Sequence, residues 1–299
     1  MYVVRLLLDK GADPNVPNDF GTTALHFAVC GHGDTSTAEM LLSAGADINA
    51  LDGEGASSLY LACERGKTEF VRLLLIHGAN PNIAKGRYRC YPLHAACTGL
   101  HYDVVKLLLE HNADVDARNE NGETALHYIV SLYHTDMGKS SALVQLLLDA
   151  GADINAVNDD GESVVCFATI NAIEGDFSQS TEERMNRQSA VRLLLQHGAN
   201  VNVRMPDGRS PLNLTVTALK EAGTRVPEYR TCVIELLRLL VKYGAQLHDS
   251  PCPCQLRGNL YRRSFNTLTL TTLGDEGNFI VELFRAGAGL HCWRSVVTL

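Results

Sequence analysis

Runs of leucine and other aliphatic residues alternate along this chain with short polar segments rich in glycine, aspartate and asparagine. Each run is followed by Gly-Ala-Asp, Gly-Ala-Asn or a close variant. The alanine of this tripeptide lies at positions 12, 46, 79, 113, 152, 199, 245 and 288, so successive copies are 34, 33, 34, 39, 47, 46 and 43 residues apart. Self-similarity at a nearly fixed period predicts an array of stacked units.

The pattern within one copy predicts a tip followed by two short helices. Residues 52–55 have the composition of a hairpin-like tip, because glycine adopts positive φ without steric cost. Ser57 stands where a helix N-cap belongs, and the apolar positions after it predict a first helix. A second helix is expected over residues 69–77, with Gly78 as its C-terminal stop. Two such helices cannot bury their own apolar faces, so neighbouring copies must stack on them.

Three copies open the first helix with related tetrapeptides, namely Thr23-Ala24-Leu25-His26, Tyr91-Pro92-Leu93-His94 and Thr124-Ala125-Leu126-His127. In this motif and in its period the chain resembles the ankyrin repeat family over essentially its whole length. The resemblance implies an all-α fold, an ankyrin-repeat solenoid of stacked helix-turn-helix units with hairpin-like tips. It also implies protein binding rather than catalysis.

We expect a single array over residues 1–299. The expected boundaries are a half repeat at 1–17, repeats at 18–50, 51–83 and 84–117, repeats with insertions at 118–156, 157–203 and 204–248, and a degenerate C-terminal repeat at 249–299. The insertions fall between the first and second helices, near 131–140, 169–189 and 217–230, where longer second helices are predicted.

The chain begins inside a repeat, since residues 2–9 match a second helix with no first helix before it. We therefore expect Val3, Leu6 and Leu7 to lack part of their packing partners. Full burial of one such side chain stabilises a fold by about 1.5–3 kcal/mol. On this ground the sequence is expected to be part of a longer array.

Composition favours an intracellular protein, cytoplasmic or nuclear, and the chain is expected to be a monomer. Nine cysteines, several at helical repeat positions such as Cys63, Cys97 and Cys166, are typical of reduced small apolar residues. The net charge of −8 argues against nucleic-acid binding, which requires a basic surface. No apolar run is long enough for membrane insertion.

No catalytic or metal-binding residues are predicted, and no cofactor is expected. His26, His94 and His127 share one repeat position, and stacking would hold them about 10 Å apart, too far to converge on a metal. We expect each to bond neighbouring backbone or cap hydroxyls. The segment His248–Cys254 contains a Cys-x-Cys pair, but zinc sites usually space their cysteines more widely, so a proline-rich loop is favoured.

Tips on a rigid scaffold usually carry binding function, so their variation is the best guide to specificity. Most tips here are acidic or neutral, whereas one is basic and aromatic. The candidate partner-binding residues of that tip are Lys85, Arg87, Tyr88, Arg89 and Tyr91. Further candidates are Glu64, Arg65 and Thr98 of the first helices, and Arg204 and Arg209 beside the seventh tip.

Arginine and tyrosine are enriched at interaction hot spots, and arginine recognises carboxylates and phosphates. We therefore expect a partner segment with acidic or phosphorylated groups; the alternative is an exposed tip without a partner. Phe27, Tyr128 and Phe167 directly follow the tetrapeptide position, and packing between repeats is the simpler expectation for them.

The late insertions and degenerate last repeat are similar to those of ankyrin proteins that end in a suppressor-of-cytokine-signalling (SOCS) box. That resemblance implies the substrate-recognition part of a cullin–elongin ubiquitin ligase receptor. Residues 291–297 are too short for the box, which recruits elongins. Two alternatives remain open: a cytoskeletal or signalling adaptor, and a metal-dependent enzyme built around Cys252 and Cys254.

Overall fold

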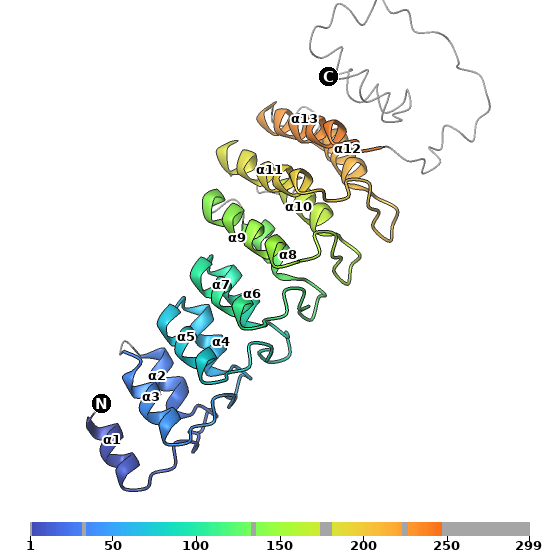
Figure 1. The fold of residues 1–299 in the computed structure, drawn as a ribbon. Coiled ribbons are helices and arrows are strands. Elements are labelled where there is room, and N and C mark those ends of the chain that lie inside the picture. Colours follow the sequence, from blue (N-terminus) through green and yellow to red (C-terminus); the bar gives the residue numbers. More distant parts are fainter. Residues whose placement is uncertain (1, 32–33, 133–135, 174–180, 223–226, 247–299) are drawn as a thin grey trace, which may run out of the picture. The chain divides into compact units, whose positions relative to one another are not determined.

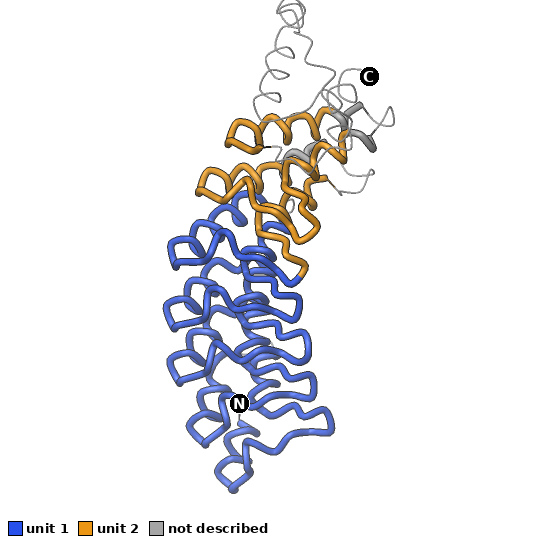
Figure 2. Tube along the Cα trace, turned by 90° about the vertical axis from the view of Figure 1, so that its right-hand side faces the viewer, with its two compact units in different colours: residues 1–159 blue, residues 160–299 orange. Residues whose placement is uncertain are grey.

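The computed structural model describes residues 2–31, 34–132, 136–173, 181–222 and 227–246. Within these residues the chain folds into helices joined by turns, with two isolated antiparallel bridges, Leu51–Ser57 and Lys85–Cys90, at the bases of tips. The helices form two compact units, residues 1–159 and 160–299 (Figure 2). The predicted all-α fold is confirmed, whereas the predicted repeat boundaries stay a prediction.

The first unit holds nine helices among its described residues. They are α1 (Tyr2–Asp9), α2 (Ala24–Cys30), α3 (Ser36–Ser43), α4 (Ser58–Glu64), α5 (Thr68–Ile76), α6 (Pro92–Thr98), α7 (Tyr102–Glu110), α8 (Ala125–Leu132) and α9 (Met137–Asp149). The second unit holds α10 (Val164–Ile173), α11 (Thr181–Gln196), α12 (Pro211–Ala222) and α13 (Pro227–Lys242) in its described part.

Helices of the first unit pack in two rows. The first helices α2, α4, α6 and α8 contact one another in sequence, and the second helices α5, α7 and α9 do the same (Figure 1). Each helix from α2 to α9 has a fully or almost fully buried leucine at the same repeat position, which is Leu25, Leu59, Leu93 and Leu126 in the first row and Leu41, Leu74, Leu108 and Leu147 in the second. The periodic leucines therefore form the shared core between neighbours.

The second unit has longer helices. The second helices α11 and α13 have 16 residues each, and α9 of the first unit has 13, which confirms the prediction for the insertions. The first helices α10 and α12 are also extended, to 10 and 12 residues, which the sequence analysis did not predict. Gln188 ties α11 to α13, because its Nε2 donates to the Cys232 carbonyl at 2.6 Å. Residues 174–180 and 223–226, which belong to two of the insertions, lie outside the described residues.

Helix α1 confirms the expected exposure of its apolar side chains. None of its residues is buried, and Val3 and Leu7 are 65% and 54% exposed. The degenerate repeat over 249–299 and the His248–Cys254 segment lie outside the described residues. The hypothesis of a longer array stays a prediction.

A ladder of asparagine side chains joins successive repeats. The Oδ1 atom of each accepts the backbone N–H of a residue in the next repeat, in the pairs Asn15–Asp47 (2.6 Å), Asn49–Asn80 (2.9 Å), Asn82–Asp114 (2.8 Å) and Asn202–Gln246 (2.8 Å). The Nδ2 atom of Asn82 also donates to the Asn112 carbonyl at 3.0 Å. Asp116 occupies the same position and accepts from Asp153 N–H at 3.0 Å, but a carboxylate cannot donate.

The buried histidines are structural, as predicted. The Nδ1 atom of His26 accepts from the Thr23 backbone N–H at 3.2 Å, so Nε2 must carry the proton that it donates to the Ala56 carbonyl at 3.0 Å. His94 does the same between Tyr91 N–H (3.1 Å) and the Ala117 carbonyl (3.0 Å). One neutral imidazole thus caps its own helix and bonds a more distant loop.

Burial lowers the pKa of His94 from 6.5 to about 4. The bond to Ala117 opposes this shift, and the nearby His127 adds to it. Protonation of His94 would abolish the acceptor at Nδ1, so the fold requires the neutral ring.

The asparagine ladder gives a matched pair of substitutions. In Asp116→Asn the new Nδ2 should donate to the Gly151 carbonyl, as Asn82 donates to Asn112, and the free energy of unfolding should rise by about 1 kcal/mol. In Asn82→Asp the same bond is lost, and stability should fall by a similar amount. Urea unfolding followed by circular dichroism measures both; changes of the same sign in the two variants would contradict the ladder.

The pKa of His94 predicts an acid-sensitive fold. Because the unfolded chain binds a proton near pH 6.5 and the folded chain only near pH 4, this stabilisation is complete above pH 6.5 and is lost as the pH falls toward 4. The loss is about 1.4 kcal/mol per pH unit inside that window. Urea unfolding at several pH values should show a steeper decline in the parent chain than in His94→Gln, which cannot be protonated. Equal slopes in the two chains would contradict this assignment.

Candidate functional site

The tips of the first unit are bonded to one another and extend to one side of the helix pairs (Figure 1). The backbone N–H of Gly53 donates to the Phe20 carbonyl at 2.8 Å, and that of Glu120 donates to the Tyr88 carbonyl at 3.0 Å. A Cβ atom at Gly53 would lie 2.6 Å from the Phe20 oxygen, so only glycine permits this approach. The tips therefore form a ledge of fixed spacing, which we call the tip ledge.

The basic tip, residues 85–91, has one residue more than its neighbours. Nine positions separate Asn82 from Tyr91, where eight separate Asn49 from Ser57. The backbone N–H of Lys85 donates to the Cys90 carbonyl at 2.8 Å and closes the longer hairpin.

Arg89 of the basic tip has a backbone conformation that is rare for its residue type. Its φ is 50°, whereas the same position in neighbouring tips is occupied by Gly21, Gly55 and Gly122. A side chain in this left-handed region costs roughly 1–2 kcal/mol relative to the right-handed one. The extra residue and the arginine at a glycine position distinguish this tip from the others.

Three side chains of the basic tip are presented to solvent. The Arg87 guanidinium lies 4.6 Å from the centre of the Tyr88 ring and donates to the Tyr88 hydroxyl. Tyr88 is 52% exposed, and Arg89 is exposed with its Nη2 atom 3.4 Å from the Tyr91 hydroxyl. These contacts hold the Arg87 guanidinium beside an aromatic ring and the Arg89 guanidinium beside a phenol hydroxyl.

Lys85 and Tyr91 are half-buried at the two ends of the basic tip and contact residues outside it. The Lys85 Nζ atom lies 3.2 Å from a carboxylate oxygen of Glu54 and 5.2 Å from the centre of the Tyr60 ring. The Tyr91 ring meets His94 edge-on at 5.6 Å. Arg87, Tyr88 and Arg89 are thus the accessible part of the predicted set.

Glu64, Arg65 and Thr98 are exposed, but they lie at the C-terminal ends of first helices, whereas the tips precede the N-terminal ends. The Arg65 Nη1 atom contacts the Cys30 sulfur at 2.8 Å, and the Thr98 hydroxyl donates to the His94 carbonyl at 2.9 Å. The structure therefore does not bring these residues together with the basic tip, and their role stays a prediction.

Arg204 and Arg209 belong to the second unit and are both exposed. The Arg209 Nε atom lies 2.5 Å from a carboxylate oxygen of Asp207 in the same tip. The pKa of Asp207 is lowered, first by its bond from the Arg209 backbone N–H and then by the Arg209 side chain. The sequence analysis did not predict this pairing, which neutralises one of the two cations.

The prediction that Phe27 packs between repeats is wrong. Tyr128, at the same repeat position, is half-buried and stacks on His94 of the preceding repeat at 5.0 Å. Phe27 is 57% exposed, because among the described residues no first helix precedes α2 to cover it.

Phe20 and Leu51 are exposed on the tip ledge, although neither was predicted from the sequence as a binding residue. A signal for Phe20 is present in the sequence, because Glu54, Asn121 and Asp160 are polar at the same repeat position. Leu51 has no such signal, since Val157 is apolar at its position too.

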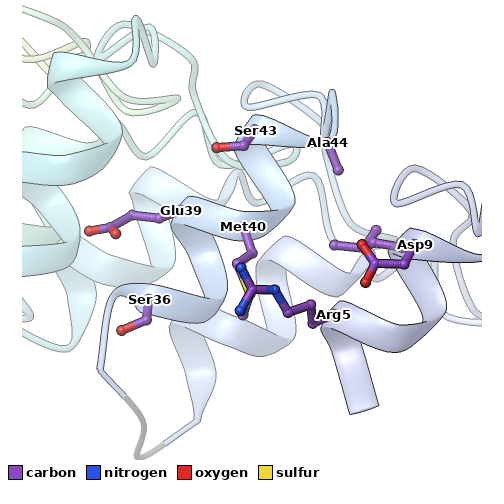
Figure 3. A pocket seen from close by; sticks show the side chains of 8 residues that line it. Arg5, Asp9, Ser36, Glu39, Met40, Ser43 and Ala44 are labelled. Atoms are coloured by element: carbon purple, nitrogen blue, oxygen red, sulfur yellow. The ribbon is translucent and has the colours of Figure 1, made fainter. Parts of the chain in front are cut away.

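One hollow of about 570 Å³ lies between α1 and α3 (Figure 3). Its polar lining combines the Arg5 guanidinium with the carboxylates of Asp9 and Glu39, and the hollow is open to solvent. In the part of the chain that the structure describes, no three His, Cys, Asp or Glu side chains are grouped so that they could hold a metal ion. Among these residues no helix combines the length and apolarity needed to cross a membrane.

Comparison with known proteins identifies relatives that share the repeat. The B-cell lymphoma 3 protein homolog of Mus musculus is 36% identical over 129 residues, which are 42% of this chain and 29% of that protein. Ankyrin repeat and SOCS box protein 11 of Danio rerio is 42% identical over 94 residues, 31% of each chain. An ankyrin repeat protein of Acanthamoeba polyphaga mimivirus is 29% identical over 136 residues, 46% of this chain and 18% of that protein. The chain thus spans less than a third of each relative.

A crystal structure of an ankyrin repeat domain from Acinetobacter baumannii superposes with a TM-score of 0.57 at 28% identity, covering 74% of this chain and 98% of that one. The family described as ankyrin repeats in three copies matches residues 1–85 and 83–158. This fold is generally a non-catalytic module for protein–protein interaction. With the periodic leucines, the paired helices and the bonded tips, these matches show that the chain belongs to the ankyrin repeat family.

Proposed function

We propose that this chain is a non-catalytic protein-interaction scaffold whose basic tip binds an acidic or phosphorylated segment of a partner protein. The ankyrin repeats support protein binding in general. The exposed Arg87 and Arg89 support the chemistry of the partner, because the planar guanidinium group matches carboxylate and phosphate oxygens in a fork geometry. The proposed binding unit is a monomer in the cytoplasm or nucleus.

The observation that carries this proposal is the positive φ of Arg89 in a tip with one extra residue. Strained backbone conformations persist where the surrounding structure holds them, and they cluster at binding and active sites. Glycine at this position would relieve the strain, as it does in the neighbouring tips. The presence of an arginine at this position is therefore best explained by a contact between its side chain and a partner.

The charge of one acidic side chain near Arg87 and Arg89 is already offset within the tip ledge. The carboxylate of Glu54, on the adjacent tip, is paired with Lys85 at 3.2 Å, so its repulsion of an anionic partner is reduced. The Tyr88 ring restricts the Arg87 side chain, which lowers the entropy lost on binding. In this proposal Lys85 and Tyr91 position the tip, while Glu64, Arg65 and Thr98, and Arg204 and Arg209, contact other parts of the partner.

The double variant Arg87→Gln with Arg89→Gly separates binding from stability. Two charge-assisted hydrogen bonds are lost, so recovery of the partner should fall at least roughly tenfold. The glycine relieves the positive φ, so the free energy of unfolding should rise by up to about 1 kcal/mol. Affinity purification with quantitative mass spectrometry measures recovery, and urea unfolding measures stability.

Arg72→Gln is the matched control, because Arg72 is an exposed arginine of α5, in the row of second helices. Proteins captured equally by the parent chain, the control and the double variant would contradict the role of the basic tip. Reduced capture together with reduced stability would contradict the proposed strain at Arg89.

We further propose that the partner is a substrate of a cullin–elongin ubiquitin ligase for which this chain forms part of the receptor. The similarity to Ankyrin repeat and SOCS box protein 11 over 94 residues supports this assignment. Proximity labelling from a tag on the endogenous gene product should then label elongins and a cullin. Labelling of cytoskeletal or signalling proteins without elongins would favour the alternative, an adaptor with no ubiquitin link.

A further inference from the structure

Two tips that precede the basic tip present apolar side chains to solvent. Phe20, in the tip over residues 18–21, is 78% exposed, and Leu51, at the base of the tip over residues 52–55, is 48% exposed. Single apolar residues on a surface are ordinary, but large ones gathered on neighbouring elements mark sites of protein contact. Here they lie on successive members of the tip ledge.

The apolar tips are continuous with the basic tip. The Gly53 N–H donates to the Phe20 carbonyl at 2.8 Å, which joins the first tip to the second. A Cβ atom on Gly55 would lie 2.8 Å from the Gly86 nitrogen, so the second tip is in close contact with the third. Phe20 and Tyr88 thus lie in the first and third of three consecutive tips, and Leu51 lies at the base of the second.

Charge changes sign along this surface. The exposed Asp19 adjoins Phe20, whereas Arg87 and Arg89 extend from the basic tip. Glu54 lies between them and is paired with Lys85. An anionic partner group is therefore repelled at the Phe20 end and attracted at the Arg87 end, which fixes how a bound segment lies.

The repeat spacing sets the distance between the two ends. Neighbouring helices pack roughly 8–10 Å apart, so Phe20 and Arg87, two repeats apart, are separated by about 20 Å along the ledge. An extended chain advances about 3.3 Å per residue, so about six residues span that distance.

We propose that the tip ledge from Phe20 to Arg89 binds one extended segment of a partner protein, which carries an apolar side chain and, about six residues away, an anionic side chain. The apolar residue contacts Phe20 and Leu51, and the anionic residue contacts Arg87 and Arg89. This inference rests on the proposed function of the basic tip and adds the second contact and the spacing.

Selection from a displayed library of random peptides of about 12 residues, roughly 40 Å when extended, tests the proposal on the full chain. Enriched peptides should carry Phe, Leu or Ile and, five to seven residues away, Asp or Glu. Fluorescence anisotropy of an enriched peptide should show at least tenfold weaker binding to Phe20→Ser with Leu51→Ser, and likewise to Arg87→Gln with Arg89→Gly. Phe20→Ser alone, at the more exposed position, should weaken binding at least threefold without changing the melting temperature.

Ile76→Ser is the matched control, since Ile76 is 68% exposed but ends α5 in the row of second helices, and it should leave binding unchanged. Replacing the acidic residue of the peptide by phosphoserine shows whether a carboxylate or a phosphate binds more tightly. If the acidic peptide and the phosphopeptide both fail to bind Arg87→Gln with Arg89→Gly, the result supports the proposal.

Peptides that need Arg87 and Arg89 but show no apolar residue at this spacing would overturn the inference and leave the proposed function intact. Peptides whose binding survives both the apolar and the arginine variants would overturn the two together. A library without any enriched sequence would also overturn the inference, because a preformed ledge should select its ligand from it.

Discussion

Each repeat of this chain depends on its neighbour to bury the apolar faces of its two helices. The helices from α2 to α9 bury a leucine at a constant repeat position, such as Leu59 in α4 and Leu74 in α5, and two short helices alone could not enclose either. Polar bonds between repeats then fix the register that this burial leaves open. Asn82 bonds the following repeat, and the Nε2 atom of His94 bonds the Ala117 carbonyl. These contacts help to fix where the described tips of the first unit lie.

Most of the fold could be predicted from the sequence, because the period of the leucines and the helix-opening motif are local patterns with a known physical meaning. The structural role of the histidines followed from the same pattern. The site was harder to predict, because it depends on pairings between residues of different tips or on backbone angles. Neither the partnership of Lys85 with Glu54 nor the positive φ of Arg89 can be read from residue types alone. Phe27 was misjudged because its exposure depends on what precedes α2.

The basic tip has a backbone conformation and an exposed side chain that would both make an isolated hairpin of this sequence unstable. An arginine in the left-handed region weakens the tip, and its side chain is presented to solvent instead of packing inside. Stability for this conformation comes from outside the tip, through the Lys85 contacts to Tyr60 and the Glu120 bond to the Tyr88 carbonyl. The neighbours therefore keep in place a hairpin whose own sequence would not favour this shape.

The asparagine ladder separates the length of a tip from the geometry of the scaffold. Asn82 precedes the basic tip in the sequence, and its partners Asn112 and Asp114 follow the two helices that come after that tip. The bonds between them span the tip, so the additional residue is accommodated inside the hairpin. Insertions in tips can accordingly change what the surface recognises while the pitch of the array stays constant. Such an architecture allows the binding specificity of the protein to evolve one loop at a time, while the packing of the core stays unchanged.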